Sequence, residues 1–210
     1  MNEITIKTFD KAPIFACKSY LISKDNHCLL IDCGYFSQEL KKEIESYDYF
    51  DGVVLTHKHF DHIFGLIELL KAFPNTKIYS HAIDEFFTNS QLNCSYFMLE
   101  KELILNIKSI NLIEGRNEIG VFTIDVLYTP GHTSDSIIFA LNTEPIAFLG
   151  DTIFLETIGR TDLLSSSPEQ MQNSLLKAKD FLIKKDYQIF CGHGKNGTSK
   201  QLFSLNPYIK

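Results

Sequence analysis

Four short β-rich runs in this chain each lead directly into a residue that can bind a metal ion. These residues are His57, His132, Asp151 and His193, after "VVLT", "VLYTPG", "IAFLG" and "QIFCG". In layered α/β proteins the carboxyl ends of strands commonly form the ligand crevice, so we expect these side chains at one sheet edge. Glycines stand before three of them and permit tight turns: Gly131, Gly150 and Gly192.

The first of these runs opens a string rich in histidine, "THKHFDH" at residues 56–62. It holds three of the seven histidines of the chain. His57 and His59 are two residues apart and can point to the same side, while Asp61 and His62 turn toward a second position. Imidazole and carboxylate groups are ligands that zinc and iron accept. The string therefore predicts a metal site rather than a solvated polar loop.

Strand-like and helix-like stretches alternate around these residues. Helices are predicted through Leu40 and Ile44, from Ile63 to Leu70, over residues 82–107, and from Pro168 after a capping Ser167. β-rich runs occupy residues 3–9, 14–23, 27–32, 52–55, 76–80, 110–113, 120–128, 136–141, 145–150 and, as the closing strand, 187–190. Since no linker interrupts this order, we expect one domain over residues 1–210 with sheets covered by helices.

Composition excludes several classes of protein. The net charge of −6 disfavours a nucleic-acid binder, which usually carries a basic stripe. No apolar stretch approaches the length of a membrane span, and the N-terminal residues do not resemble a secretory signal. Five cysteines without a C-x-x-C pair indicate free thiols in a reducing compartment. We therefore expect a cytoplasmic protein with neither nucleic acid nor membrane as a partner, and no thiolate ligation of zinc.

Several motifs together resemble one family. The chain is similar to the metallo-β-lactamase-fold hydrolases, and more narrowly to the glyoxalase II (hydroxyacylglutathione hydrolase) branch. The matching stretches are "LIDCG" at 30–34, "THKHFDH" at 56–62, "TPGHT" at 129–133, "GDTIF" at 150–154, "IGRTDL" at 158–163 and "CGHG" at 191–194. The resemblance implies an α+β fold of αββα type, a four-layer sandwich of two β-sheets flanked by helices.

The resemblance also implies two divalent metal ions, zinc in the first instance, with iron or manganese still open. The first ion would be held by His57, His59 and His132. The second would be held by Asp61, His62 and His193, and Asp151 would bridge the two. Asp32 matches an aspartate that follows an early strand in the family. It either holds a ligand in place or simply ends the strand.

The chain departs from the family pattern around the expected substrate pocket. Phe64 stands where the family usually has the first of two glycines, and Ser134 and Asp135 replace a Pro-Gly pair. "LLSSSP" follows Asp162 in place of a Pro-x-Gly-Asp run. Glyoxalase II enzymes carry a C-terminal helical domain that helps bind glutathione, for which this sequence has no room after His193. We therefore expect weak, slowly saturating hydrolysis of S-lactoylglutathione.

By this resemblance the chain is a metal-dependent hydrolase whose substrate is a small acyl thioester. A hydroxide bridging the two ions would attack the carbonyl carbon, and Asp61 or Asp151 would act as the catalytic proton acceptor. A thioester suits such a site because a thiolate leaving group needs little protonation. The oligomeric state is not indicated by the sequence.

Other functions fit the same ligands. A mononuclear iron persulfide dioxygenase shares the fold, and a lactonase or another small-ester hydrolase is a near alternative. An RNA-processing nuclease, a flavodiiron protein and a purely structural metal site fit the sequence less well. His27 and His81 lie outside the matching motifs and are not expected to be ligands. Arg160 forms either an ion pair with Asp162 or a contact with a substrate carboxylate.

Overall fold

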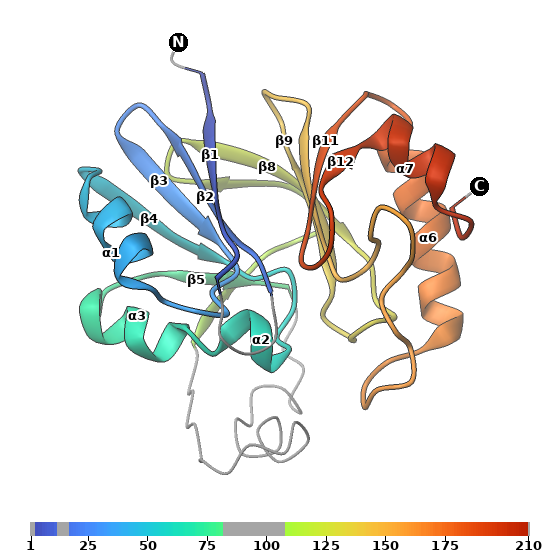
Figure 1. Cartoon of the computed structure of the whole chain (residues 1–210), viewed down its shortest axis with the longest axis horizontal. Helices are drawn as coiled ribbons and strands as arrows, with labels where there is room; N and C mark the ends of the chain where they lie inside the picture. The colour runs from blue at the N-terminus through green and yellow to red at the C-terminus, as the bar shows by residue number, and fades with distance from the viewer. Residues whose placement is uncertain (1–2, 12–16, 82–107, 210) are drawn as a thin grey trace. The chain divides into compact units, whose positions relative to one another are not determined.

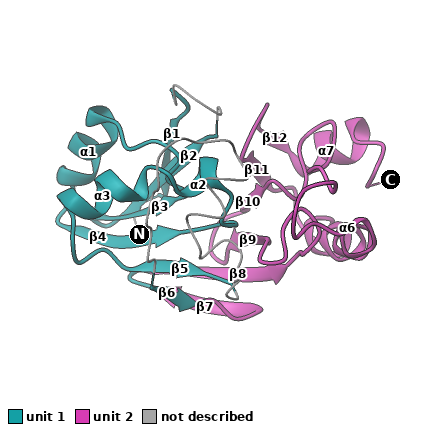
Figure 2. Ribbon diagram, turned by 90° about the horizontal axis from the view of Figure 1, so that it is seen from below, with its two compact units in different colours: residues 1–111, 119–121 teal, residues 112–118, 122–210 magenta. Residues whose placement is uncertain are grey.

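The computed structural model describes residues 3–11, 17–81 and 108–209, so the helix expected over 82–107 lies outside the described residues, as does Cys94. The chain divides into two compact units, coloured separately in Figure 2. The first comprises residues 1–111 and 119–121, and the second comprises residues 112–118 and 122–210. Within the described residues no helix is long and apolar enough to cross a membrane.

The first unit is built on a mixed, six-stranded sheet. Its strands, in spatial order, are β1 (Thr5–Phe9), β2 (Ser19–Lys24), β3 (His27–Ile31), β4 (Tyr49–Val54), β5 (Ile78–Ser80) and β6 (Ser109–Asn111). β1, β2 and β3 pair antiparallel, whereas β3, β4, β5 and β6 pair parallel. The β-rich runs at 14–23 and 27–32 contribute β2 and β3, and in the turn between them Asp25 and Asn26 adopt φ values of 49° and 64°, as tight hairpin turns require.

Helices α1 (Gln38–Glu45) and α3 (Leu66–Ala72) accompany this sheet (Figure 1). Leu40 of α1 and Leu69 of α3 share one apolar cluster with Leu30 of β3. The single helix expected from Ile63 to Leu70 is wrong, because the segment is split into α2 (Phe60–Ile63) and α3. At the break Gly65 packs against Cys33, and its N–H donates to the Cys33 carbonyl at 2.8 Å.

The second unit contains the other six-stranded mixed sheet. Its strands, in spatial order, are β12 (Gly197–Thr198), β11 (Gln188–Cys191), β10 (Ile146–Gly150), β9 (Ile137–Leu141), β8 (Phe122–Tyr128) and β7 (Gly115–Ile119). β10 and β11 are parallel, while β9 is antiparallel to both β8 and β10. β8, β10 and β11 therefore run in one direction, and their carboxyl ends meet at the same edge of the sheet.

Two helices pack on this second sheet, α6 (Pro168–Leu182) and α7 (Ser199–Leu205) (Figure 1). α6 begins where the sequence predicted, and the Ser167 hydroxyl accepts the N–H of Gln170 at 3.2 Å. Met171 and Leu182 of α6 and Leu202 of α7 belong to one apolar cluster. The interpretation of residues 187–190 as the closing strand is wrong, since β12 and α7 follow β11. α7 has seven residues, too few to display a helical period in the sequence.

Candidate metal centre

The histidine string of the first unit is positioned by the parallel pair β3–β4. Asp32 directly follows β3, and its N–H donates to the carbonyl of Val54, the last residue of β4, at 2.9 Å. This bond places the Asp32 carboxylate beside Thr56, at the start of the string. Two parallel strands thus deliver the aspartate and the histidines to one edge of the first sheet. The strands that precede His132, Asp151 and His193 belong to the other sheet, so the expectation of a single sheet edge for all four strand ends is wrong.

The Asp32 carboxylate is the organising group of this edge. One oxygen accepts the Thr56 N–H at 2.8 Å, and the other accepts the Thr56 hydroxyl at 2.8 Å. The second oxygen also lies 2.8 Å from Nδ1 of His62. All three residues are buried, so each of these polar groups depends on its partner. Asp32 therefore does more than end a strand, because it fixes a residue that the sequence predicted to be a metal ligand.

These hydrogen bonds define which nitrogen of two histidines is available to a cation. His62 donates Nδ1–H to the Asp32 carboxylate, so its Nε2 carries the lone pair. The Thr56 hydroxyl donates its proton to Asp32 and lies 3.1 Å from Nδ1 of His57. Nδ1 of His57 is therefore the donor to the Thr56 hydroxyl, and Nε2 of His57 is available to a cation. Histidines that bind metals commonly donate the other ring N–H to a carboxylate, carbonyl or hydroxyl in this manner.

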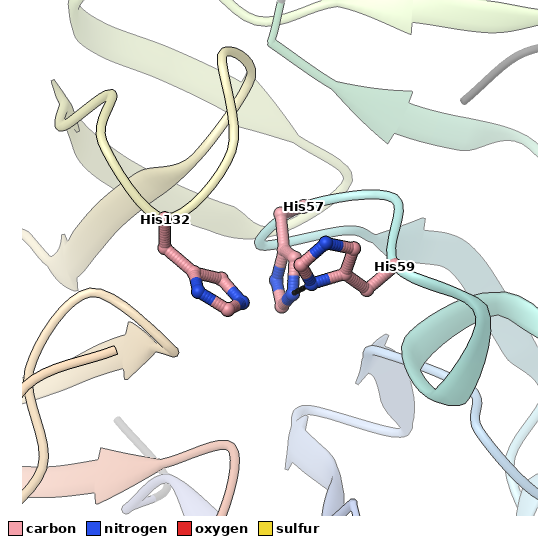
Figure 3. Close-up of side chains that lie close together, drawn as sticks. All are labelled: His57, His59 and His132. Atoms are coloured by element: carbon pink, nitrogen blue, oxygen red, sulfur yellow. Dashed lines mark hydrogen bonds between the residues drawn. The ribbon is translucent and has the colours of Figure 1, made fainter. Parts of the chain in front are cut away.

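His57 and His59 bring two ring nitrogens together. Nε2 of His57 and Nδ1 of His59 lie 3.1 Å apart, the contact drawn in Figure 3, which also shows His132 of the second unit. Two nitrogens bound to one zinc ion at about 2.0–2.1 Å with tetrahedral angles would be roughly 3.3 Å apart. Both side chains are buried. The pair therefore has the spacing and the donor chemistry of two ligands to one ion.

Asp61 and His62 lie on the short helix α2. Oδ2 of Asp61 is 3.9 Å from Nε2 of His62, the nitrogen that Asp32 leaves available. The His62 imidazole is fully buried, whereas Asp61 is partly exposed. The first unit thus brings together all of the candidate ligands that the sequence located in the histidine string.

In the second unit the candidate ligands come from three separate strand ends. His132 follows β8, Asp151 follows β10, and His193 follows β11. Oδ2 of Asp151 lies 3.6 Å from Nε2 of His132 and 3.4 Å from Nε2 of His193. A single carboxylate oxygen therefore approaches both imidazoles. His132 and Asp151 are buried, while the side chain of His193 is 31% exposed.

Backbone groups hold His132 in place. Its Nδ1 donates to the carbonyl of Arg160 at 2.9 Å, so its Nε2, the nitrogen facing Asp151, carries the lone pair. The loop that carries His132 is closed by hydrogen bonds of its own, from the Tyr128 hydroxyl to the Ser134 carbonyl and from the Thr133 hydroxyl to Asp135. Ser134 and Asp135, which depart from the family pattern, are therefore part of the loop's internal bonding.

Two glycines that sequence reasoning did not single out support the candidate aspartates. A Cβ atom on Gly34 would lie 1.9 Å from the carbonyl oxygen of Asp61, and one on Gly159 would lie 1.9 Å from that of Asp151. No side chain fits at either position. The signal was present, because both glycines fall inside motifs already quoted, "LIDCG" and "IGRTDL". Among the glycines that were expected to form turns, Gly131 and Gly150 do adopt positive φ.

The described cysteines are free and buried, as expected: Cys17, Cys28, Cys33 and Cys191. Burial raises the pKa of Cys17 to about 12 and that of Cys28 to about 12, and it raises the pKa of the Cys33 thiol further. These three thiols stay protonated at neutral pH and are poor nucleophiles. The Cys17 thiol lies close to Asp32 and His62, whereas the other candidate ligand groups of the described residues consist of imidazoles and carboxylates alone.

The remaining residues of interest have local roles. His27 lies 3.0 Å from the Asp51 carboxylate and stacks on Tyr49, outside the candidate ligands as expected. Arg160 pairs with both carboxylate oxygens of Asp162, at 2.7 and 2.8 Å, so the local ion pair predicted from the sequence is present. His81 follows β5, outside the candidate ligands. The side chain of Lys58, which separates His57 and His59 in the sequence, is buried. The sequence did not indicate this burial, because Lys58 stands in a polar string.

Comparison with known proteins identifies the family. Residues 12–193 match the model of the metallo-beta-lactamase superfamily. The chain is 29% identical over 201 residues to the protein described as probable metallo-hydrolase YqgX of Bacillus subtilis, covering 94% of this chain and 93% of YqgX. It is 28% identical over 164 residues to a hydroxyacylglutathione hydrolase of Francisella tularensis subsp. novicida, covering 75% of this chain and 56% of the enzyme.

Among solved structures, the crystal structure of the B3 metallo-beta-lactamase BLEG-1 resembles this one with a TM-score of 0.85 at 25% identity. The match covers 98% of this chain and 99% of that protein. The expected fold class is thereby confirmed: two mixed sheets flanked by helices, in the α+β fold of the superfamily. The organisation of residues 1–210 as a single domain stays a prediction.

Proposed function

Because the chain belongs to the metallo-beta-lactamase superfamily, whose hydrolases bind divalent metal, we propose that it is a thioesterase acting on small acyl thioesters. The observation that carries the proposal is the orientation of the candidate ligands. His62 and His132 each donate Nδ1–H to a protein acceptor and keep Nε2 for a cation. Such an arrangement fits a divalent ion better than a solvated polar loop, which needs no fixed tautomer.

The proposed centre holds two ions, with zinc as the metal. His57, His59 and His132, the side chains drawn in Figure 3, would hold the first ion. Asp61, His62 and His193 would hold the second, and Asp151 would be shared by the two ions. All of them are imidazoles or carboxylates, which zinc, iron and manganese accept. The approach of Asp151 to both His132 and His193 supports a bridging role for this carboxylate.

Two divalent cations bound close together supply an activated water and polarise a substrate carbonyl. The residues of the chain then have distinct tasks. The backbone of Asp151 packs against Gly159, and its carboxylate lies against two imidazoles. Asp151 can therefore keep the ligands aligned and accept the proton of the attacking water. Asp61 is partly exposed and can pass a proton on to solvent. His193, also partly exposed, is a ligand that substrate can approach.

A thioester suits these residues for a chemical reason. Hydrolysis forms a C–O bond and breaks a C–S bond, and the sulfur leaves as a thiolate that requires no proton from the enzyme. Since Cys17, Cys28 and Cys33 are protonated thiols, attack by water fits better than attack by cysteine. The relative that hydrolyses hydroxyacylglutathione supports this substrate class, although the match spans 56% of that enzyme.

The experiment combines metal analysis with a substrate panel. We expect about two zinc, iron or manganese ions per chain and hydrolysis of acyl thioesters in preference to lactones, simple esters and a chromogenic β-lactam. Oxygen uptake with glutathione persulfide by a protein holding one iron ion would instead establish a dioxygenase. Turnover of lactones or β-lactams without thioester turnover would contradict the proposed substrate class and leave the family assignment intact.

A further inference from the structure

A pocket of about 420 Å³ opens beside His193 in the second unit. Its walls include Phe154 and Leu155 from the segment after β10, and Gly194 and Lys195 from the segment after β11. The Phe154 ring stands edge-on to the His193 imidazole, with the ring centroids 6.2 Å apart. The apolar wall therefore begins at a proposed metal ligand, within reach of a group that is attached to the reacting carbonyl.

The segment that forms this wall is rigid. Ile153 and Ile158 form a β-bridge, and the Phe154 N–H donates to the Thr157 carbonyl at 2.8 Å. The buried side chain of Asn206, at the end of α7, donates to the carbonyls of Phe154 and Thr157, each at 2.8 Å. These bonds close the turn and anchor it to the core. A preformed wall lowers the ordering cost of binding, which is a property of small-molecule sites.

The rim of the pocket carries one charge of each sign. Lys195 Nζ lies 3.7 Å from a carboxylate oxygen of Glu156, and both side chains are mostly exposed. An exposed pair of this kind is weak and leaves little net charge to attract a charged ligand. Inside the rim, Phe154 and Leu155 offer contacts to an apolar group. The chemistry of the pocket therefore favours an uncharged hydrocarbon chain.

The volume restricts what this pocket holds. It lies near the lower end of the roughly 300–1,000 Å³ that is usual for small-molecule sites. A thiol carrier such as glutathione bears two carboxylates and an amine, and the Lys195–Glu156 pair at the rim offers little net charge to hold any of them. A short aliphatic acyl chain brings no such charge and needs no polar partner.

On this basis we propose that the pocket is the acyl-chain subsite and selects thioesters of short, unbranched aliphatic acids over the hydroxylated lactoyl group. The inference rests on the proposed function, because it places the acyl end of a thioester substrate, rather than its thiol end, in this pocket. Each buried methylene contributes about 0.8 kcal/mol, which corresponds to roughly a fourfold gain in binding. Activity should therefore rise from acetyl through butanoyl to hexanoyl thioesters of one thiol.

The test fills the pocket and measures chain-length dependence in two ways. Thr157→Trp adds bulk at an exposed position on the wall, while its backbone carbonyl can still accept from Asn206. Thr143→Trp is the matched control, at an exposed threonine in the β9–β10 turn, outside the pocket. The first readout is kcat/KM for acetyl, butanoyl, hexanoyl and lactoyl thioesters of the same thiol. The second is calorimetric binding of acetate, butanoate and hexanoate to the metal-loaded protein.

We expect the wild type and Thr143→Trp to prefer hexanoyl over acetyl by more than tenfold in both readouts, and Thr157→Trp to lose most of this ratio. Lys195→Trp, in the other segment that lines the pocket, should act in the same direction if Thr157→Trp unfolds. Thioester turnover without chain-length preference would overturn the subsite and leave the thioesterase intact. Chain-length-dependent carboxylate binding that Thr157→Trp abolishes, without thioester turnover, would support the pocket and reject the thioesterase.

Discussion

The two units present their candidate ligands in different ways. In the first unit His57, His59, Asp61 and His62 come from one continuous stretch, and a buried carboxylate, Asp32, fixes one of them. In the second unit three ligands come from three strand ends, and His132 is fixed by a backbone carbonyl. The first arrangement can be recognised in the sequence, because its residues are neighbours in the chain. The second arrangement depends on the order of the strands in the sheet. Substitutions in the two units should therefore have different consequences.

The largest expected effect is that of Asp151→Ala. This carboxylate lies against both His132 and His193, so its loss should empty the proposed bridge and remove a contact from both imidazoles. We expect kcat to fall by more than the roughly 10–100-fold that is typical when only a partner of a metal ligand is lost. Metal content and kcat of the purified variant check this. Asp61→Ala should retain more metal, because Asp61 is partly exposed and its Oδ2 lies 3.9 Å from Nε2 of His62, farther than Asp151 lies from its two imidazoles.

The Arg160→Ala variant is the control for this prediction, since the Arg160 side chain is exposed and forms an ion pair with Asp162. It should damage activity least of the three. If Asp151→Ala keeps wild-type turnover and metal content, the bridging role of Asp151 is wrong.

The next effect concerns the two glycines that pack against the backbone of Asp61 and Asp151. Gly34→Ala and Gly159→Ala each place a Cβ atom 1.9 Å from a carbonyl oxygen, of Asp61 and Asp151 respectively. Overpacking against backbone of this kind costs typically about 1–3 kcal/mol and shifts the chain. We expect a lower free energy of unfolding and a loss of metal in both variants. Gly115→Ala is the control, because its Cβ meets nothing within 4 Å, although its φ of +96° makes it mildly strained.

A result in which only Gly34→Ala loses metal would show that the strand ends of the second unit tolerate displacement better than the single loop of the first. Equal losses would show that both units depend on close backbone contact despite their different construction. Retention of metal by both variants would contradict the packing argument.

The candidate ligands of the first unit were easier to predict from the sequence than the residues that support them. The H-x-H-x-D-H string is visible without any fold, since its members are neighbours in the chain. The sequence did not decide whether Asp32 holds a ligand in place or simply ends a strand. The parallel pairing of β3 with β4 places Asp32 beside Thr56, and this pairing joins residues that are far apart in the sequence. For His132 the supporting atom is the carbonyl of Arg160, and a backbone atom carries no signature in the sequence.

The fold was predicted in outline with errors at short segments. Strands β8, β9 and β10 and helix α6 are close to their expected positions, since each is long or strongly patterned. β7 (Gly115–Ile119) was missed, because its residues are mostly exposed and polar and show no alternation. The break between α2 and α3 was missed because apolar spacing continues through it, and only the contact of Gly65 with Cys33 ends the helix.

The third prediction compares the two kinds of support. Asp32→Asn replaces the carboxylate that accepts from both Thr56 and His62 with an amide that cannot accept on both sides. We expect metal affinity to fall by about 10–100-fold. Arg160→Ala leaves the backbone carbonyl that accepts from His132 and should keep affinity near the wild-type value. Competition with a chelator measures both. Equal losses in the two variants would mean that the Arg160 side chain also supports the site.

The smallest effect is expected from Asp162→Asn, which tests whether the Arg160–Asp162 pair contributes to the backbone support of His132. The Arg160 guanidinium holds the pKa of Asp162 below its ordinary value. A depressed folded-state pKa stabilises the protein above the unfolded-state value of 3.8, and this contribution is lost as the pH falls through the folded-state pKa. Wild type and variant should therefore differ slightly in Tm at pH 6 and low salt, and converge near pH 2. Because both side chains of the pair are mostly exposed, added salt should also erase the difference. Metal content should be unchanged, since the carbonyl of Arg160 belongs to the backbone. A variant that loses metal at pH 6 would show that the ion pair fixes this carbonyl, and the second unit would then rely on side chains as the first unit does.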